Sequence, residues 1–393
     1  MKKHALYMIL WMAAAISSCV YPYEPDVKGS AGRNLVIEGD ILIGDISTIR
    51  LGYMAYLDED YSELSVPAEV MVESEAGEVY KGKNVTDANH YIVNLTDATM
   101  DDKYRLHVKL DDGREYATAW TAPRKACVVD DITHELDSTR SQVRFNISLH
   151  SDDGEQFFRW FFEEDWEYAS LYEAKFLYHP PSREDFESGV QDSGHMVKMG
   201  AADGTHFCWM NDVSHSLLFT TTRDLVSNTV TEKNFYRVPS QSEKMSVLYA
   251  MTVRVESLSK DSYDYWNTMK TNSEKVGDLF SPIPSEMRGN IYNLNDSTEL
   301  VLGYINVSGV AEKRIFVDNS VTGYYIKQSY IPEENWMIPI LPDEWPRYYY
   351  YKNYLPVSDG EGPEYYWAPK RCVDCRLQGG TKARPAFWPN EHF

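Results

Sequence analysis

The chain has 393 residues, of which 60 are acidic and 38 basic, so its formal net charge is −22. An acidic balance of this size repels phosphate backbones and anionic lipid headgroups, which argues against nucleic acid and against membrane binding through a basic surface. Hydrophobic residues make up 43% of the chain and aromatic residues 13%, which suffices for one large core or two ordinary ones and excludes a disordered chain.

Residues 1–18 predict a secretory signal peptide. Lys2 and Lys3 precede an uncharged apolar run over residues 5–16, which ends on small residues. This run is shorter than the roughly 20 residues that a lasting transmembrane helix needs. Loss of the two lysines with the signal would change the net charge from −22 to −24.

The segment Ile16-Ser17-Ser18-Cys19 resembles the bacterial lipobox. The resemblance implies cleavage before Cys19 and acylation of Cys19, whose lipid chains would hold the protein on a membrane. An ordinary secretory signal with a chance cysteine is the alternative. Residues 19–33 are polar and contain prolines, which is typical of a short tether. We therefore expect a lipid-anchored protein of the cell envelope, at the outer membrane and exposed on the surface.

Residues 34–122 predict an N-terminal Ig-like β-sandwich. Their short runs alternate polar with apolar residues, as a strand with one buried face requires. Asp111-Asp112-Gly113 and Ala76-Gly77 predict the turns of two hairpins, because Gly accepts the positive φ of tight turns. The runs that alternate most clearly are 35–40, 47–51, 68–72 and 104–110.

Residues 123–393 predict a larger β-rich domain with one short helix. We place the boundary at Ala122-Pro123, because proline cannot donate to a central ladder. Residues 143–149 alternate, and Asp152-Asp153-Gly154 predicts a turn into residues 156–162, which are apolar on both faces and should lie deep in a sheet.

The helix is expected near residues 259–276. Ser259 is a suitable N-cap, and the apolar residues Tyr263, Trp266 and Met269 recur at a spacing of three. The fold class is therefore all-β, with a sandwich followed by a larger β domain that carries this helix.

The C-terminal tail is rich in aromatic residues and is the most suggestive candidate for a binding surface. Aromatic rings give rigid contact area and dominate interface hot spots. If exposed, they would form a ligand platform or a docking patch; if buried, they pack over the sheet of the second domain. Solvent exposure decides between these readings for Trp345, Tyr349, Tyr351 and Trp367.

Four cysteines remain after Cys19: Cys127, Cys208, Cys372 and Cys375. They are disulfide candidates in an oxidising compartment, and the sequence leaves all three pairings open. The Cys372-Val373-Asp374-Cys375 spacing also occurs in redox and zinc sites. A structural disulfide, within this motif or to Cys208, is favoured, because no thioredoxin-like pattern or second ligand pair accompanies it.

No metal, cofactor or catalytic residue is predicted. His206, Cys208 and His215, with His195 nearby, would suit a soft metal, but a disulfide-bonded Cys208 would be a poor ligand. Carboxylates are too numerous to single out the pair, about 5 to 10 Å apart, that a glycosidase needs. The motifs G-x-S-x-G and H-E-x-x-H and a Gly-rich phosphate loop are absent from the sequence. We therefore expect a protein that is not an enzyme.

The order of several motifs resembles a Bacteroidota lipoprotein family catalogued as domain of unknown function 4249. The resemblance rests on the lipobox and on segments spread along the chain: Val36–Gly39, Phe207–Trp209, Leu258–Lys260 with Tyr263 and Trp266, Gly289–Ile291, Val301–Tyr304, Lys313–Arg314, Cys372–Arg376, Gly379–Thr381 and Pro385–Trp388.

Such proteins are commonly encoded beside TonB-dependent outer-membrane transporters, which implies an accessory role in nutrient uptake. We expect a non-catalytic binding protein that captures a small-molecule, peptide or glycan ligand or contacts the transporter. The alternatives are a structural or adhesive surface protein and, more weakly, a hydrolase.

Overall fold

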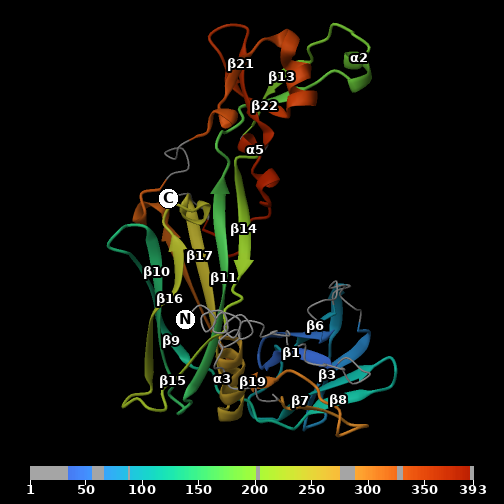
Figure 1. Ribbon diagram of the computed structural model, residues 1–393, viewed down its shortest axis with the longest axis vertical. Coiled ribbons are helices and arrows are strands. Elements are labelled where there is room, and N and C mark those ends of the chain that lie inside the picture. Colours follow the sequence, from blue (N-terminus) through green and yellow to red (C-terminus); the bar gives the residue numbers. More distant parts are fainter. Residues whose placement is uncertain are drawn as a thin grey trace, which may run out of the picture.

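The computed structural model describes residues 34–54, 66–86, 89–200, 204–274, 288–324 and 331–389. The predicted signal peptide, Cys19 and the tether lie outside these residues. Strands account for 47% of the structure and helices for 14%, which confirms the predicted all-β class. Within the described ranges, no helix has the length and apolar character needed to cross a membrane. The second sandwich and an apical module, residues 170–200 and 331–374, together form a tall arm (Figure 1). The apical module lies at one end of this arm, and an N-terminal sandwich lies beside its other end, the foot.

Two facing sheets form the N-terminal sandwich, in the strand orders β19-β1-β2-β6-β5 and β18-β8-β7-β3-β4. The core-facing residues Ile37, Leu51 and Val72 are almost completely buried, as the alternating pattern predicted. The predicted turns at 76–77 and 111–113 join β3 to β4 and β7 to β8. The strands are β1 (Leu35–Leu42), β2 (Ile46–Tyr53), β3 (Ala68–Ser74), β4 (Val79–Lys81), β5 (Lys83–Thr86), β6 (His90–Asn94), β7 (Tyr104–Leu110) and β8 (Glu115–Thr118).

A segment from much later in the chain completes this sandwich. Strand β18 (Ile291–Asn293) pairs with β8, and β19 (Asn306–Ser308) pairs in parallel with β1. The span 34–122 predicted for this unit is therefore incomplete. Between these strands the chain crosses β1 so closely that a Cβ on Gly303, at φ +115°, would lie 1.8 Å from the Ile37 carbonyl oxygen, and only glycine fits there.

Two sheets also form the second sandwich, and they share one hydrophobic core. The order is β16-β10-β9 in one sheet and β14-β11-β17-β20 in the other, with β15 also paired to β11. The long strand β11 is central and almost continuously buried; the apolar run over residues 156–162 predicted this for its first half, but not for the acidic second half. The strands are β9 (Val128–Leu136), β10 (Gln142–His150), β11 (Phe157–Ala169), β14 (Phe207–Val213), β15 (Leu218–Thr221), β16 (Thr229–Pro239), β17 (Leu248–Ser257) and β20 (Val310–Asp318).

The turn at 152–154 has a different role from the hairpin turns. Strands β10 and β11 do not pair with each other, so this turn carries the chain from one sheet to the facing one. The predicted helix is present as α3 (Lys260–Glu274), and Ser259 caps it by accepting a hydrogen bond from the Ser262 N–H at 3.0 Å. Helix α3 lies at the foot of the tall arm, next to β19 (Figure 1).

The apical module is built from two segments, residues 170–200 and 331–374. Its first segment leaves the end of β11, and its second leads into the C-terminal tail. A two-stranded hairpin and the three-stranded sheet β21-β23-β22 form its frame. Its elements are β12 (Phe176–His179), α2 (Arg183–Glu187), β13 (His195–Lys198), β21 (Ile338–Ile340), α4 (Trp345–Arg347), a π-helical turn (Tyr348–Lys352), β22 (Tyr354–Asp359), β23 (Tyr365–Pro369) and α5 (Lys370–Val373).

Candidate functional site

The apical module has its own aromatic core, which holds two of the predicted binding residues. Trp367 is 0% exposed and Trp345 is 7% exposed. Both indoles pack edge-on against Tyr178, with ring centroids 5.2 and 6.0 Å away, and the Trp345 indole N–H donates to the Ile340 carbonyl at 3.1 Å. The prediction that Trp345 and Trp367 form a ligand platform is therefore wrong: a small sheet needs large rings to fill its core, and these two fill it.

The two predicted tyrosines lie nearer the surface. Tyr349 is half-buried, and the Lys370 ammonium lies 4.1 Å from its ring centroid. Tyr351 is 53% exposed, packs beside Phe186 of α2, and donates a hydrogen bond to a Glu187 carboxylate oxygen at 3.3 Å. Of the four predicted aromatic residues, Tyr351 is the most accessible to a partner.

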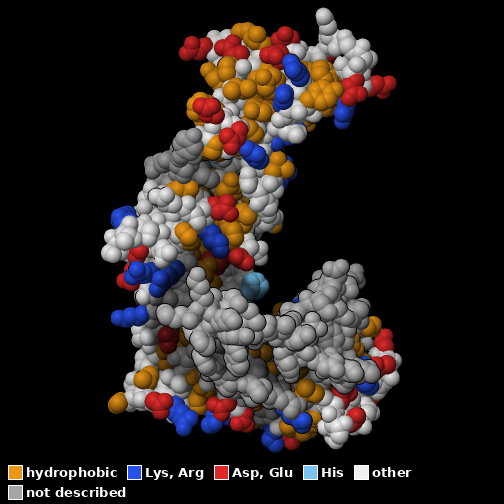
Figure 2. Space-filling view, in the orientation of Figure 1, with side chains coloured by type: hydrophobic (Ala, Val, Ile, Leu, Met, Phe, Trp, Pro, Cys, Tyr) orange, Lys and Arg blue, Asp and Glu red, His pale blue; other side chains and the backbone are white. Residues whose placement is uncertain are grey.

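Large apolar side chains gather on the surface of the apical module (Figure 2). Leu177 and Val197 are directly opposite each other in the β12–β13 hairpin and are 48% and 44% exposed. On the same outward face, His179 and His195 stack with ring centroids 4.9 Å apart. We call the exposed apolar residues of this module the apical patch: Leu177, Val190, Val197, Trp336, Met337, Leu341 and Tyr351.

Exposed apolar residues that occur singly need no explanation, but a cluster at one end of a molecule is typical of an interaction surface. Leu177 and Val197 are not among the binding residues predicted from the sequence. A leucine in a short alternating strand can face the core or the solvent, and the sequence does not show which face of this hairpin is buried.

The cysteines form one structural bridge beneath the module. Cys208 of β14 is bonded to Cys375, with their Cα atoms 5.7 Å apart, and a Cβ on Gly380 would lie 2.5 Å from the Cys208 Cβ. The bridge and this close packing fasten the C-terminal tail to the second sandwich. Cys127 and Cys372, also disulfide candidates, are instead buried free thiols. Burial raises the pKa of Cys127 to about 12 and also raises that of Cys372, so both thiols are unreactive.

The soft-metal site considered for His206, Cys208 and His215 is not formed. The Cys208 sulfur is consumed by the disulfide, and the His206 ring nitrogen Nδ1 lies 2.9 Å from the Ser170 hydroxyl. Over the part of the chain that the structure describes, no group of three or more His, Cys, Asp or Glu side chains is arranged to hold a metal ion.

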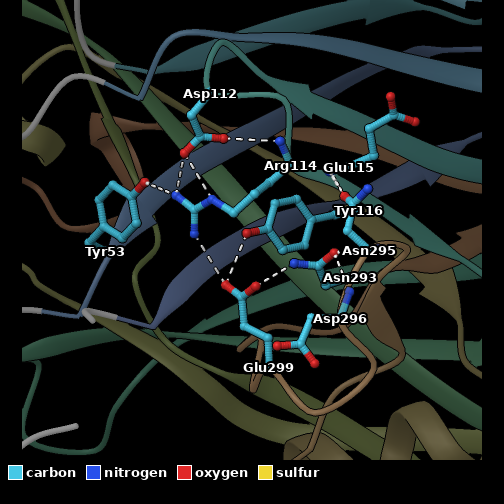
Figure 3. A network of polar contacts seen from close by, with 9 residues as sticks. All are labelled: Tyr53, Asp112, Arg114, Glu115, Tyr116, Asn293, Asn295, Asp296 and Glu299. Carbon is cyan, nitrogen blue, oxygen red and sulfur yellow. Dashed lines mark hydrogen bonds and ion pairs between the residues drawn. The ribbon is translucent and has the colours of Figure 1, made fainter. Parts of the chain in front are cut away.

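The segment that carries β18 and β19, residues 288–308, is called the returning segment below. A polar network fastens it to the rest of the N-terminal sandwich (Figure 3). The Glu299 carboxylate accepts hydrogen bonds from the Arg114 guanidinium at 3.3 Å, from the Tyr116 hydroxyl at 2.9 Å and from the Asn293 amide. Burial beside this carboxylate raises the pKa of Tyr116. Because these groups satisfy one another, the network is structural and offers no free carboxylate for acid or base catalysis.

A buried acid pair lies at the junction of the two sandwiches. The Arg159 guanidinium of β11 contacts Asp40 of β1 and bonds to Glu256 of β17 at 3.0 Å, and it lies 4.8 Å from the Trp266 ring centroid. Burial raises the pKa of Asp40 to about 7, against the opposing effect of Arg159. A second pair, Arg254 with Asp45, joins the same two units. Arg159 and its two carboxylate partners therefore form a clamp that holds the two sandwiches together.

Comparison with known families decides what kind of chain this is. The family model described as "Domain of unknown function (DUF4249)" matches residues 20–314. The chain belongs to this family. Its DUF4249 span takes in the N-terminal sandwich, most of the second sandwich and the first segment of the apical module. The second apical segment and the Cys372–Cys375 motif follow the matched span.

Other comparisons add little to the DUF4249 assignment. No curated protein matches the chain. Among solved structures, chitinase ChiA74 from Bacillus thuringiensis is similar at 9% identity over 52% of this chain and 29% of its own length, with a TM-score of 0.14. That likeness is too weak to bear on either fold or activity.

Proposed function

We propose that this DUF4249 protein is a lipid-anchored envelope protein that acts without chemistry, as an accessory to a TonB-dependent outer-membrane transporter. Lipid chains on Cys19 would hold it on the membrane. The apical patch would contact the transporter. The arrangement of the apical patch relative to the start of the described chain is the observation that carries this proposal.

The described chain begins at Asn34 in the N-terminal sandwich, whereas the apical patch is at the far end of the tall arm (Figure 1). A tether that enters at the foot would leave the apical module clear of the anchor and free to contact a transporter in the same membrane. Exposed apolar side chains cost solubility, so the apolar surface of this module favours a protein partner over open solvent.

The second candidate function is a structural or adhesive surface protein. The elongated arm formed by the second sandwich and the apical module favours it, because such an arm can serve as a spacer (Figure 1). The two functions differ in the partner: the accessory role requires a specific complex with a transporter, and the spacer role does not.

Affinity purification from membranes solubilised in mild detergent tests the proposal. The full chain should bring a TonB-dependent transporter with it. The variant Leu177→Ser/Val197→Ser removes apolar surface without adding charge. We expect the amount of recovered transporter to fall about tenfold, which corresponds to a loss of about 1.4 kcal/mol of binding free energy. Leu225→Ser is the matched control, because Leu225 is 52% exposed but lies in the second sandwich.

Two results would count against the accessory role: no transporter recovered with the unmodified chain, or equal recovery with the apical variant. The anchor is tested separately with Cys19→Ala, which should release the protein from the membrane fraction and abolish incorporation of labelled palmitate.

A further inference from the structure

A cavity of about 580 Å³ opens where the two sandwiches meet. Four separate parts of the chain line it: the linker at 120–125, the β10–β11 turn, the start of α3, and the returning segment that carries Asn290 and Tyr304. Its volume falls within the roughly 300–1,000 Å³ of small-molecule sites, which often lie at such junctions. The docking role proposed above makes no use of it.

Three of the motifs on which the family resemblance rests meet at this cavity, and none of them takes part in the proposed docking. Asn290 braces the opposite wall by donating to the Ile305 carbonyl at 2.7 Å and accepting from the Ile305 N–H at 2.9 Å. Ser259 caps α3, and its hydroxyl lies 3.5 Å from the Tyr304 hydroxyl. These contacts fix the position of Tyr304 before any ligand arrives, which lowers the entropy cost of binding.

The charged residues of the wall neutralise one another. The Arg124 guanidinium lies 3.6 Å from a Glu155 carboxylate oxygen, and the Lys125 ammonium lies 2.6 Å from an Asp153 carboxylate oxygen. Two cations and two anions leave no net charge on this wall, so it gives no advantage to an anionic or a cationic ligand. It does offer donors and acceptors in close alternation, and these suit a ligand with many hydroxyl groups.

Trp120 supplies an aromatic surface at the same site. Its side chain is 37% exposed and lines the cavity, and the Arg105 guanidinium lies 4.5 Å from its ring centroid. That cation–π contact holds the indole in place. The C–H face of a pyranose ring is apolar while its rim is polar, so an indole beside paired ions and a phenol matches both parts of a sugar.

We infer that the junction cavity binds a short neutral saccharide, with a sugar ring packed on Trp120 and its hydroxyls bonded to the paired charges and to Tyr304. The inference goes beyond the docking role, because saccharide binding at the junction and transporter contact at the apical patch can each fail alone.

The test uses the purified full chain on an array of neutral and acidic oligosaccharides, followed by calorimetric titration with the neutral oligosaccharide that gives the strongest signal. We expect neutral oligosaccharides to bind and acidic ones not to. Trp120→Ala removes the ring on which the sugar packs and should raise the Kd about tenfold, which corresponds to about 1.4 kcal/mol. Trp120→Phe, which keeps a ring, should retain most of the affinity and so separates loss of contact from loss of fold.

Trp336→Ala is the matched control, because Trp336 is 51% exposed but lies in the apical module. It should leave the Kd unchanged. The inference is overturned if no neutral oligosaccharide binds at millimolar concentration, if acidic oligosaccharides or short peptides bind more tightly, or if Trp120→Ala and Trp336→Ala have the same effect.

Discussion

Replacing Arg159 by Met should strongly destabilise the fold, because Arg159 is the cation between two buried carboxylates. The side chains of Arg159, Asp40 and Glu256 are 9%, 15% and 1% exposed. Removing one partner of such a buried pair costs about 3–5 kcal/mol, because the remaining charge is uncompensated. Loss of the contact with Trp266 adds about 0.5–1 kcal/mol.

The pH sets where in this range the loss should fall. Burial raises the pKa of Asp40 to about 7 and Arg159 opposes this rise, so without Arg159 a proton on Asp40 relieves the uncompensated charge more readily at pH 6 than at pH 8. We therefore expect a loss of free energy of unfolding of about 3 kcal/mol at pH 6 and nearer 5 kcal/mol at pH 8. The triple variant Asp40→Asn/Arg159→Met/Glu256→Gln carries no buried charge at this position and should regain most of the loss.

Urea unfolding at both pH values, followed by circular dichroism and by tryptophan fluorescence, measures these differences. Arg183→Met is the matched control: Arg183 pairs with Glu187 at 2.8 Å, but both side chains are largely exposed, so the free energy of unfolding should hardly change. A loss below about 1 kcal/mol for Arg159→Met at pH 8 would refute the account of the junction as a clamp.

Three further predictions concern stability. Because the folded pKa of Asp40 is about 7 against an ordinary 3.8, its contribution to stability is full below about pH 4 and is lost as the pH rises to 7. The free energy of unfolding of Asp40→Asn should therefore rise relative to that of the unmodified chain between pH 4 and 7 in urea titrations, and a difference that stays constant over this range would contradict this. Gly303→Ala should cost about 3 kcal/mol or more by thermal or urea unfolding, because its Cβ would collide with the Ile37 carbonyl, whereas Gly52→Ala, with no atom within 4 Å, should change little; equal effects would sink the argument. Cys208→Ala opens a disulfide that spans 167 residues and should cost about 2–5 kcal/mol, a loss that reduction of the unmodified chain should reproduce.

Local features of the fold could be predicted from the sequence because they depend on neighbouring residues. The hairpin turns at 76–77 and 111–113 and the helix capped by Ser259 follow from turn chemistry and from apolar spacing within a few residues. The depth of the first half of β11 follows in the same way from the run over residues 156–162, which is apolar on both faces.

Long-range features could not be predicted in this way. The parallel pairing of β19 with β1 joins residues more than 260 positions apart, and three-residue strands such as β18 carry too little pattern to identify a partner. The same limit explains the aromatic tail: whether Trp345 and Trp367 are buried depends on Tyr178, which a distant hairpin supplies. The choice of Cys208 and Cys375 as the bonded pair likewise depends on the tertiary fold.

Site-specific photo-crosslinking in intact cells shows whether the apical patch contacts a transporter. A photoreactive phenylalanine analogue at position 177, in the apical hairpin, is compared with the same residue at position 225, in the second sandwich; both side chains are about half exposed. We expect a crosslinked product that contains a TonB-dependent transporter from position 177 and none from position 225. A transporter adduct from position 225 alone, or from neither position, would contradict it.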